Sequence, residues 1–221
     1  MTDVEIQVLD DPATAAAELL AHAVRRGGEV ALPGGSTVGA TFDRVVGLAP
    51  DWGTAGVWWG DERAVPPDDE RSNYRLAKER LFVRLQSQPR AVNRIEGELG
   101  PEEAADRYET AFAGVTLDLA LNGIGADGHT ASLFPNAPGL GERVRRVVAA
   151  DAGLDPFVAR VTMTPPAFAE AALLVYLVTG EGKADAVRRA FAADPSPDTP
   201  ASLVRGRRTV ALLDGAAAVD L

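Results

Sequence analysis

Short β-rich runs alternate with longer helical segments along most of the chain. The strand-like runs cover residues 5–9, 29–32, 56–59, 117–121, 173–178 and 209–213. Because helical segments separate most of these runs, the order predicts an α/β fold with a mainly parallel, doubly wound sheet and helices on both faces. No repeat of fixed period interrupts this order.

Local signals predict where several helices begin and end. Asp11 can cap a helix with Pro12 in its first turn, and Gly27 can end that helix. Ser72 is the expected N-cap of a later helix, and Pro101 opens another. Further helices are expected up to Leu48, from near Pro165 and up to Phe191.

Residues 143–163 depart from the alternation, because the runs RRVVAA and FVARVTM follow each other without a helix between them. Two adjacent strands of this kind indicate a small antiparallel excursion from the parallel sheet. The polar stretch DPSPDT at 194–199 is expected to be a surface loop and not a linker between domains. We therefore expect residues 1–221 to form a single domain.

Composition narrows the class of protein and its partners. Of the 221 residues, 46% are hydrophobic and 24% are charged, which is ordinary for a globular protein with a large core. The net charge of −10 argues against nucleic-acid or anionic-membrane binding, and any anion site must be built from local groups. The absence of cysteine excludes disulfides and thiolate chemistry.

The sequence contains no signal that would direct it out of the cytoplasm. Its first residues, MTDVEIQVLDD, are acidic and lack the basic and then apolar pattern of a signal peptide. No apolar run approaches the roughly 20 residues that a membrane span needs. We expect a cytoplasmic protein that is a monomer or a weak homo-oligomer.

Four polar or glycine-rich loops follow expected strands. They are PGGST at 33–37, GDER at 60–63, NGIGADGH at 122–129 and TGEGK at 179–183. In a parallel sheet such loops open on the same edge, where ligands of this fold class bind. Their combined content of glycines, hydroxyls and charged groups predicts a functional site there.

The PGGST loop precedes a helix. Gly34 and Gly35 allow close approach of the backbone, and with Ser36 they can present free N–H groups to an anion. The alternative is a simple tight turn in which Ser36 or Thr37 caps the helix.

Arg63 and Lys183 supply the positive charge that a phosphate would need. Arg63 could instead pair with the neighbouring Asp61 or Glu62, and Lys183 could be a solvated residue at a helix start. A cation at a helix N-terminus opposes the helix dipole, which favours a binding role for Lys183.

His129 follows Asp127 by two residues within the third loop. A neutral imidazole can take a proton from water near pH 7, and a carboxylate can hold its tautomer. A structural histidine bonded to backbone is the alternative, but position on the ligand-binding edge favours catalysis. The other histidine, His22, falls within the first helix pattern and is expected to be structural.

The same loop contains a literal G-x-G-x-x-G, formed by Gly123, Gly125 and Gly128. A dinucleotide site would need a helix directly after the third glycine, and Pro135 and Pro138 block a long one. With two distant histidines and no cysteine, a catalytic zinc would need an uncommon ligand set. We therefore expect no cofactor and no metal.

Six blocks spread over the chain carry a resemblance to a known family. They are ALPGGST, WWGDERAVPPDDERSNYRLAK, LALNGIGADGHTASLFP, RVTMTPPAFAEA, VTGEGKADAV and PASLVRG. With these blocks the chain resembles the 6-phosphogluconolactonase family along essentially its full length. The resemblance implies hydrolysis of 6-phosphoglucono-δ-lactone to 6-phosphogluconate, in the oxidative pentose phosphate pathway and without a cofactor. The partner implied is a small phosphosugar lactone.

The resemblance assigns roles to individual residues. His129 would be the general base that activates water, and Asp127 would orient it. For the mechanism itself, we expect backbone N–H groups of Gly123 or Gly125 to stabilise the oxyanion. The phosphate-binding residues implied are Gly34, Gly35, Ser36, Arg63 and Lys183.

Two positions depart from the family pattern. Val38 stands where the family often has proline, and Asn122 where it often has an aliphatic residue. Neither is a proposed catalytic group, although Asn122 could change how the loop is braced.

Two other functions compete with lactone hydrolysis. Glucosamine-6-phosphate deaminases share the G-x-G-x-D-G-H loop, but they usually continue with an AFNEP-like run that supplies a glutamate, where this chain has TASLFP. Sugar-phosphate sensors of this fold usually carry a helix-turn-helix region, and we expect none because the chain starts directly with the first strand.

Overall fold

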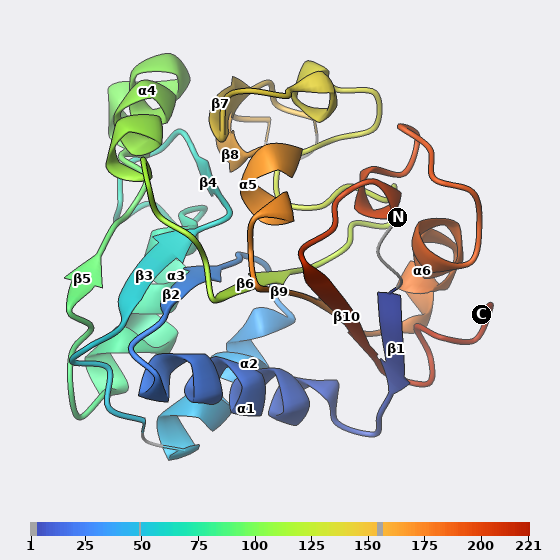
Figure 1. Cartoon of the computed structure of the whole chain (residues 1–221), viewed down its shortest axis with the longest axis horizontal. Helices are drawn as coiled ribbons and strands as arrows, with labels where there is room; N and C mark the ends of the chain where they lie inside the picture. Colours follow the sequence, from blue (N-terminus) through green and yellow to red (C-terminus); the bar gives the residue numbers. More distant parts are fainter. Residues whose placement is uncertain (1–3, 49, 154–156) are drawn as a thin grey trace.

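A computed structural model describes residues 4–48, 50–153 and 157–221. Its main sheet contains seven strands in the order β1-β10-β9-β6-β2-β3-β5, and every pair of neighbours is parallel. Figure 1 shows this sheet running across the middle of the molecule. Its strands are β1 (Val4–Val8), β2 (Glu29–Leu32), β3 (Gly56–Trp59), β5 (Ala91–Val92), β6 (Leu119–Asn122), β9 (Leu173–Val178) and β10 (Arg208–Leu213).

Helices cover both faces of the main sheet, as expected. Figure 1 shows α1 and α2 beneath the sheet and α4 and α5 above it. The helices are α1 (Pro12–Arg25), α2 (Val38–Leu48), α3 (Asn73–Arg80), α4 (Pro101–Ala111), α5 (Pro165–Ala169) and α6 (Ala184–Phe191). Short 3₁₀ turns are η1 (Phe82–Arg84), η2 (Gly97–Leu99), η3 (Pro138–Gly141), η4 (Glu181–Lys183) and η5 (Pro200–Ser202).

The predicted helix signals work as expected. The Asp11 carboxylate accepts a hydrogen bond of 3.2 Å from the Thr14 backbone N–H, so it caps α1. Gly27, just beyond that helix, has a φ of +73° that a residue with a Cβ would resist. Ser72 Oγ accepts from the Arg75 N–H at 3.1 Å and caps α3 in the same way.

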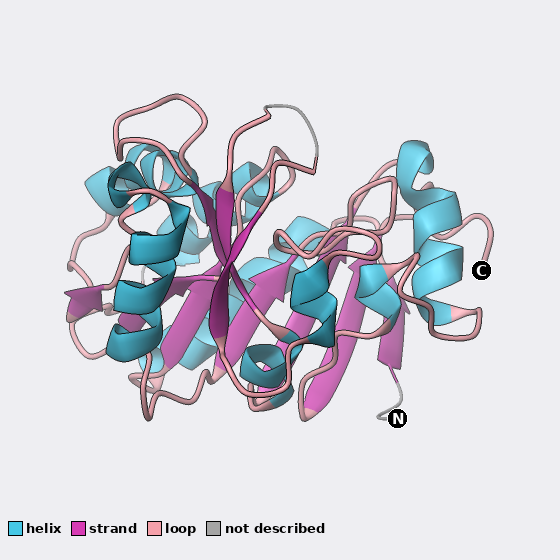
Figure 2. Ribbon diagram, turned by 90° about the horizontal axis from the view of Figure 1, so that it is seen from above, coloured by secondary structure: helices cyan, strands magenta, loops and turns pink. Residues whose placement is uncertain are grey.

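A second, three-stranded antiparallel sheet confirms the excursion expected at residues 143–163. Its order is β4-β8-β7, with β7 at Val147–Ala150 and β8 at Arg160–Met163. Its third member, β4 at Asp61–Arg63, corrects the expectation that GDER is a loop. The segment becomes a strand because it pairs with β8, a partner distant in the sequence. In Figure 2 the strands of the small sheet cross those of the main one.

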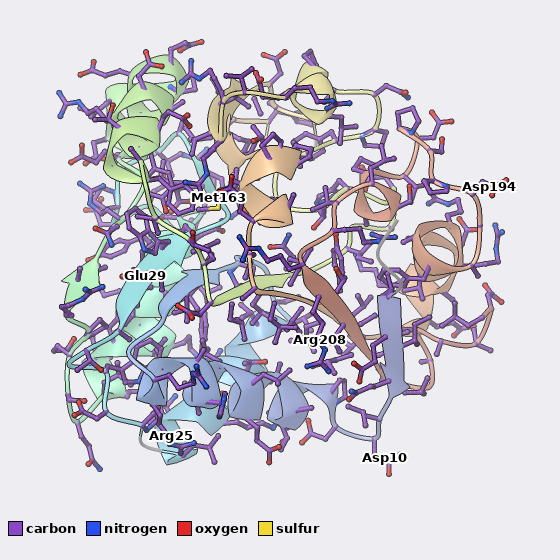
Figure 3. The ribbon with its side chains drawn as sticks, viewed as in Figure 1. Asp10, Arg25, Glu29, Met163, Asp194 and Arg208 are labelled. Atoms are coloured by element: carbon purple, nitrogen blue, oxygen red, sulfur yellow. The ribbon has the colours of Figure 1, made fainter. Side chains whose placement is uncertain are left out.

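The core lies between the main sheet and the layers on either side. The residues of β3 and β6 are all buried, which explains why these strands, apart from Asn122 at the end of β6, carry no alternating polar residues. Met163, labelled in Figure 3, is fully enclosed where the small sheet meets the main one, whereas Asp10 and Asp194 lie on the outside. None of the helices in the described ranges is long and apolar enough to cross a membrane.

Candidate active site

The four loops predicted to converge do so. They follow β9, β6, β2 and β3, which are consecutive neighbours in the parallel sheet, so their carboxyl ends open on one edge. At this edge lies a cavity of about 230 Å³. Six of the predicted site residues line the cavity: Gly34, Gly35, Ser36, Arg63, His129 and Lys183. Asp127 does not line it, but contacts His129 from behind.

His129 and Asp127 form a close pair. The His129 Nδ1 atom lies 2.6 Å from Asp127 Oδ1, which also accepts the His129 backbone N–H at 3.1 Å. His129 Nε2 makes no hydrogen bond within the described part of the chain. Burial raises the pKa of the Asp127 carboxyl, but hydrogen bonds and the charge of His129 outweigh it and leave that pKa lowered. An ionised Asp127 holds the proton on Nδ1, so Nε2 keeps a free lone pair.

The glycines of this loop make room for that pair. A Cβ on Gly125 would lie 2.0 Å from His129 Nδ1 and 2.6 Å from Asp127 Oδ1, so only glycine fits there. Gly128 has a φ of +94°. Gly125 cannot serve as an oxyanion donor without breaking the turn, because its N–H already donates to the His129 carbonyl at 2.9 Å. Of the two donors suggested, Gly123 is the one that stays free of backbone bonds within the described residues.

The PGGST turn sits at the N-terminus of α2. Gly35 has a φ of +93°, and a Cβ on Gly34 would lie 1.8 Å from Asn73 Oδ1. Neither the Ser36 nor the Thr37 hydroxyl is hydrogen-bonded to the residues the structure describes, so neither caps α2 there. The helix N-terminus and these hydroxyls are therefore open toward the cavity.

Arg63 does not pair with the carboxylates beside it. One terminal nitrogen donates to the Arg71 carbonyl, and its Nε is buried without a partner among the described residues. Glu62 instead accepts the backbone N–H groups of Asn73 and Tyr74 at 2.8 Å each, at the start of α3. Burial raises the pKa of Glu62 in spite of these bonds. Arg63 thus keeps its charge uncompensated at the cavity.

Lys183 ends η4 and immediately precedes α6. It lines the cavity, and its ammonium has no hydrogen bond or ion pair with any described residue. Lys183 is therefore at a helix start, as expected, and its side chain also faces the cavity. An uncompensated cation beside an open cavity is suited to an anionic ligand.

A third cation, Arg160, was not predicted from the sequence. It lies directly opposite Arg63 in the register of β4 and β8, lines the same cavity and is only 4% exposed. Burial, followed by the charge of Arg63, lowers the pKa of Arg160, whereas the charges of Asp61 and Glu62 act to raise it. Arg63 and Arg160 thus place two guanidinium groups on the wall of one cavity. The signal was available: an arginine in the middle of the apolar run FVARVTM.

Polar residues complete the cavity wall. Asp61 Oδ2 accepts the Ser132 hydroxyl at 2.6 Å, and its Oδ1 accepts Asn73 Nδ2 at 3.3 Å. Asn73 Oδ1 is buried against Gly34 and has no partner in the described residues. These residues were not singled out, because short polar side chains next to a strand or a helix start are common.

Asn122 forms hydrogen bonds at the base of the loop that carries His129. Its Nδ2 donates to Thr130 Oγ1 at 3.1 Å, and that hydroxyl donates to the Gly123 carbonyl at 3.0 Å. The departure from the family pattern at this position therefore adds a polar tie across the base of the loop. Val38, the other departure, is the buried first residue of α2 and lines the cavity.

The G-x-G-x-x-G pattern does not lead into a helix. Residues 129–137 form turns and an isolated bridge between Thr130 and Leu133, and the next helical turn is η3. This glycine-rich loop therefore presents no helix N-terminus to a pyrophosphate. Within residues 4–48, 50–153 and 157–221, no three histidine, aspartate or glutamate side chains form a group that could hold a metal.

A family model and individual relatives of known sequence both match the chain, and they agree on one family. Residues 5–212 match the family described as glucosamine-6-phosphate isomerases/6-phosphogluconolactonase. The chain is 35% identical over 221 residues to a 6-phosphogluconolactonase of Streptomyces coelicolor, covering 91% of this chain and 85% of that protein.

Solved structures share the fold over nearly the whole chain. A 6-phosphogluconolactonase from Thermotoga maritima superposes with a TM-score of 0.82 at 28% identity, over 96% of this chain and 100% of that one. A monomeric glucosamine-6-phosphate deaminase reaches 0.86 at 22% identity, over 99% and 100% of the two chains. The fold is therefore common to both kinds of enzyme, and side chains must distinguish them.

Proposed function

The chain belongs to the glucosamine-6-phosphate isomerase/6-phosphogluconolactonase family, and we propose that it hydrolyses 6-phosphoglucono-δ-lactone to 6-phosphogluconate in the oxidative pentose phosphate pathway. The observation that carries the proposal is the pairing of His129 with Asp127 at 2.6 Å on a cavity that Arg63 and Lys183 also line. A base and cationic side chains on one cavity suit a phosphorylated ester.

The phosphate docks between the turn at residues 34–36 and the three cations. The open N-terminus of α2 offers N–H donors, Lys183 offers an ammonium, and Arg63 and Arg160 offer guanidinium groups. Because the chain carries a net charge of −10, long-range forces repel the substrate and these local contacts supply the affinity.

Hydrolysis then requires one base and one oxyanion donor. His129 Nε2 takes a proton from water as the water oxygen bonds to C1 of the lactone. The N–H of Gly123 stabilises the negative charge on the carbonyl oxygen. When the bond from C1 to the ring oxygen breaks, His129 returns its proton to that oxygen. Asp127 stays ionised throughout and holds the imidazole in place.

Deamination of a phosphorylated amino sugar is the competing activity in this family. The segment after His129, TASLFP, contains no acid. Its Thr130 and Ser132 side chains are buried and hydrogen-bonded to Gly123 and Asp61. The carboxylate at the cavity wall is Asp61, which these contacts hold as an acceptor. The described site therefore supports lactone hydrolysis better.

A coupled assay tests the proposal. Freshly generated 6-phosphogluconolactone is mixed with the enzyme, and 6-phosphogluconate is followed through its enzymatic oxidation. Because the lactone also hydrolyses spontaneously, the His129→Ala variant measures the background. Glucosamine 6-phosphate is tested in parallel for ammonia release. Ammonia release without lactone hydrolysis above background would overturn the assignment.

A further inference from the structure

Residues 125–129 form the turn that carries Asp127 and His129, here called the histidine turn. Residues from the C-terminal part of the chain form hydrogen bonds to its outer side. Three consecutive carbonyls, those of residues 126–128, all accept hydrogen bonds from outside the loop. Arg189 Nη2 donates to Ala126 O at 3.1 Å, and Arg189 Nη1 to Asp127 O at 3.3 Å. The Ala201 N–H donates to Gly128 O at 3.0 Å.

The Arg189 guanidinium is itself fixed on two further sides. Its Nε donates to Asp185 Oδ2 at 2.8 Å on the same helix, and its Nη1 donates to Thr199 Oγ1 at 2.6 Å. The side chain is 27% exposed, which is low for a surface arginine. The planar fork therefore spans α6, the turn that carries Asp127, and the residue that precedes η5.

We propose that Arg189 is a positioning residue that holds Asp127 and His129 in the geometry needed for proton transfer. This inference rests on the proposed function for its kinetic consequences, but not for its structural ones. Two internal bonds shape the turn, from the Gly125 N–H to the His129 carbonyl and from the Gly128 N–H to the Gly125 carbonyl. The external bonds to the carbonyls of residues 126–128 then fix the turn relative to α6 and η5.

Helix α6 also connects the residue proposed to bind phosphate with the pair of Asp127 and His129. Lys183 directly precedes α6, and Arg189 lies on the same helix, so the phosphate-binding end and the base-holding contact belong to one rigid element. A phosphate bound at Lys183 thereby fixes the helix that positions His129. Misplacement of a catalytic group by about 1 Å can lower a rate by roughly 100-fold.

The neighbouring Arg188 provides a matched control. Its Nη2 donates to Asp185 Oδ1 at 2.8 Å, so it makes the same kind of helix-surface ion pair. No bond from Arg188 to the histidine turn exists among the described residues. If Arg189 served only as a surface ion pair, the two arginines would be equivalent.

The test compares Arg189→Met, which keeps the aliphatic stem, with Arg189→Lys and with the control Arg188→Met. We expect Arg189→Met to lower kcat by roughly 10- to 100-fold while KM changes little. Arg189→Lys should recover part of the rate, and Arg188→Met should retain all of it.

A second measurement does not depend on activity. The chain has two histidines, so ¹⁵N NMR resolves His129 with the exposed His22 of α1 as an internal reference. We expect the ring ¹⁵N shifts of His129 to move toward a mixture of tautomers in Arg189→Met, with His22 unchanged.

Unchanged His129 shifts and unchanged kcat in a folded Arg189→Met variant would overturn the inference. Equal losses in Arg189→Met and Arg188→Met would do the same, because they would indicate a general effect on α6. If Arg189→Met does not fold, Arg189→Lys is judged by the same two readouts. A wild-type enzyme without lactonase activity would contradict the proposed function alone, since the NMR comparison still decides the role of Arg189.

Discussion

Lys183 offers the cleanest test of phosphate recognition, because its ammonium contacts no other charged or polar group in the described structure. Replacing it by alanine removes a cation from the cavity without leaving a protein group unpaired. Arg63→Ala is less clean, since it also removes the bond to the Arg71 carbonyl. The loss in Lys183→Ala therefore measures the contact with the ligand.

The size of the effect follows from the kind of contact. A charge-assisted hydrogen bond to a phosphate is worth about 1.5–3 kcal/mol. At 25 °C this corresponds to a loss of roughly 10- to 100-fold in affinity. The excess of acidic residues cannot compensate, since a net charge of −10 repels the phosphate further once the local cation is gone.

The assay compares kcat/KM for 6-phosphogluconolactone and for unphosphorylated gluconolactone. We expect Lys183→Ala to reduce the first by roughly 10- to 100-fold and the second far less. The other lysine of the chain, Lys78, is exposed on α3 and supplies the control variant Lys78→Ala. Equal losses for both substrates would show that Lys183 supports the fold or the chemistry, and the phosphate assignment would be wrong.

Four further predictions concern the base, its support and the cofactor requirement. His129→Gln should lower kcat by about 100-fold or more with product binding retained, measured by steady-state kinetics and calorimetry; near-normal kcat would exclude it as the base. Because the pKa of Asp127 is lowered on folding, its pair with His129 stabilises the protein above the unfolded pKa of about 3.9, and this contribution is lost as pH falls through the folded value. Asp127→Asn should therefore flatten the acid limb of the urea-measured free energy of unfolding, and an unaltered limb would contradict the pairing. Gly125→Ala places a Cβ 2.0 Å from His129 Nδ1, so kcat should fall with little change in KM, whereas a normal rate would mean that the turn adapts. Activity should persist after exhaustive EDTA treatment and without nucleotides, and recovery that depends on added metal would count against the mechanism.

Elements with local signals could be predicted from the sequence. The caps Asp11 and Ser72 and the buried runs of β2 and β9 each reflect neighbouring residues, and each element lies where it was expected. The convergence of the four loops followed as well, because parallel strands share a direction. The residues that the sequence predicted for the phosphate and the base belong to those loops, so their proximity followed from topology.

What could not be predicted depends on register between distant segments. Asp61–Arg63 is polar and short, and it is a strand only because β8 pairs with it. The same pairing places Arg160 opposite Arg63. The run FVARVTM marks Arg160 as unusual, but it does not indicate which residue lies opposite. Arg189 is similar: on sequence it is one of two arginines on the polar side of a helix, and only the tertiary structure brings it to the carbonyls of Ala126 and Asp127.

The edge position of β1 has a consequence for the order in which the chain assembles. β1 pairs with β10 alone, with Val4 opposite Thr209 and Val8 opposite Leu213. Joining segments so far apart carries a large loop-closure cost, and such contacts form slowly. The strands β9, β6, β2 and β3 pair with one another without needing β1. The cavity can therefore take shape while the N-terminal strand still has no partner, and Ile6 and Val8, which stay 39% and 56% exposed even when paired, are then a surface open to other chains.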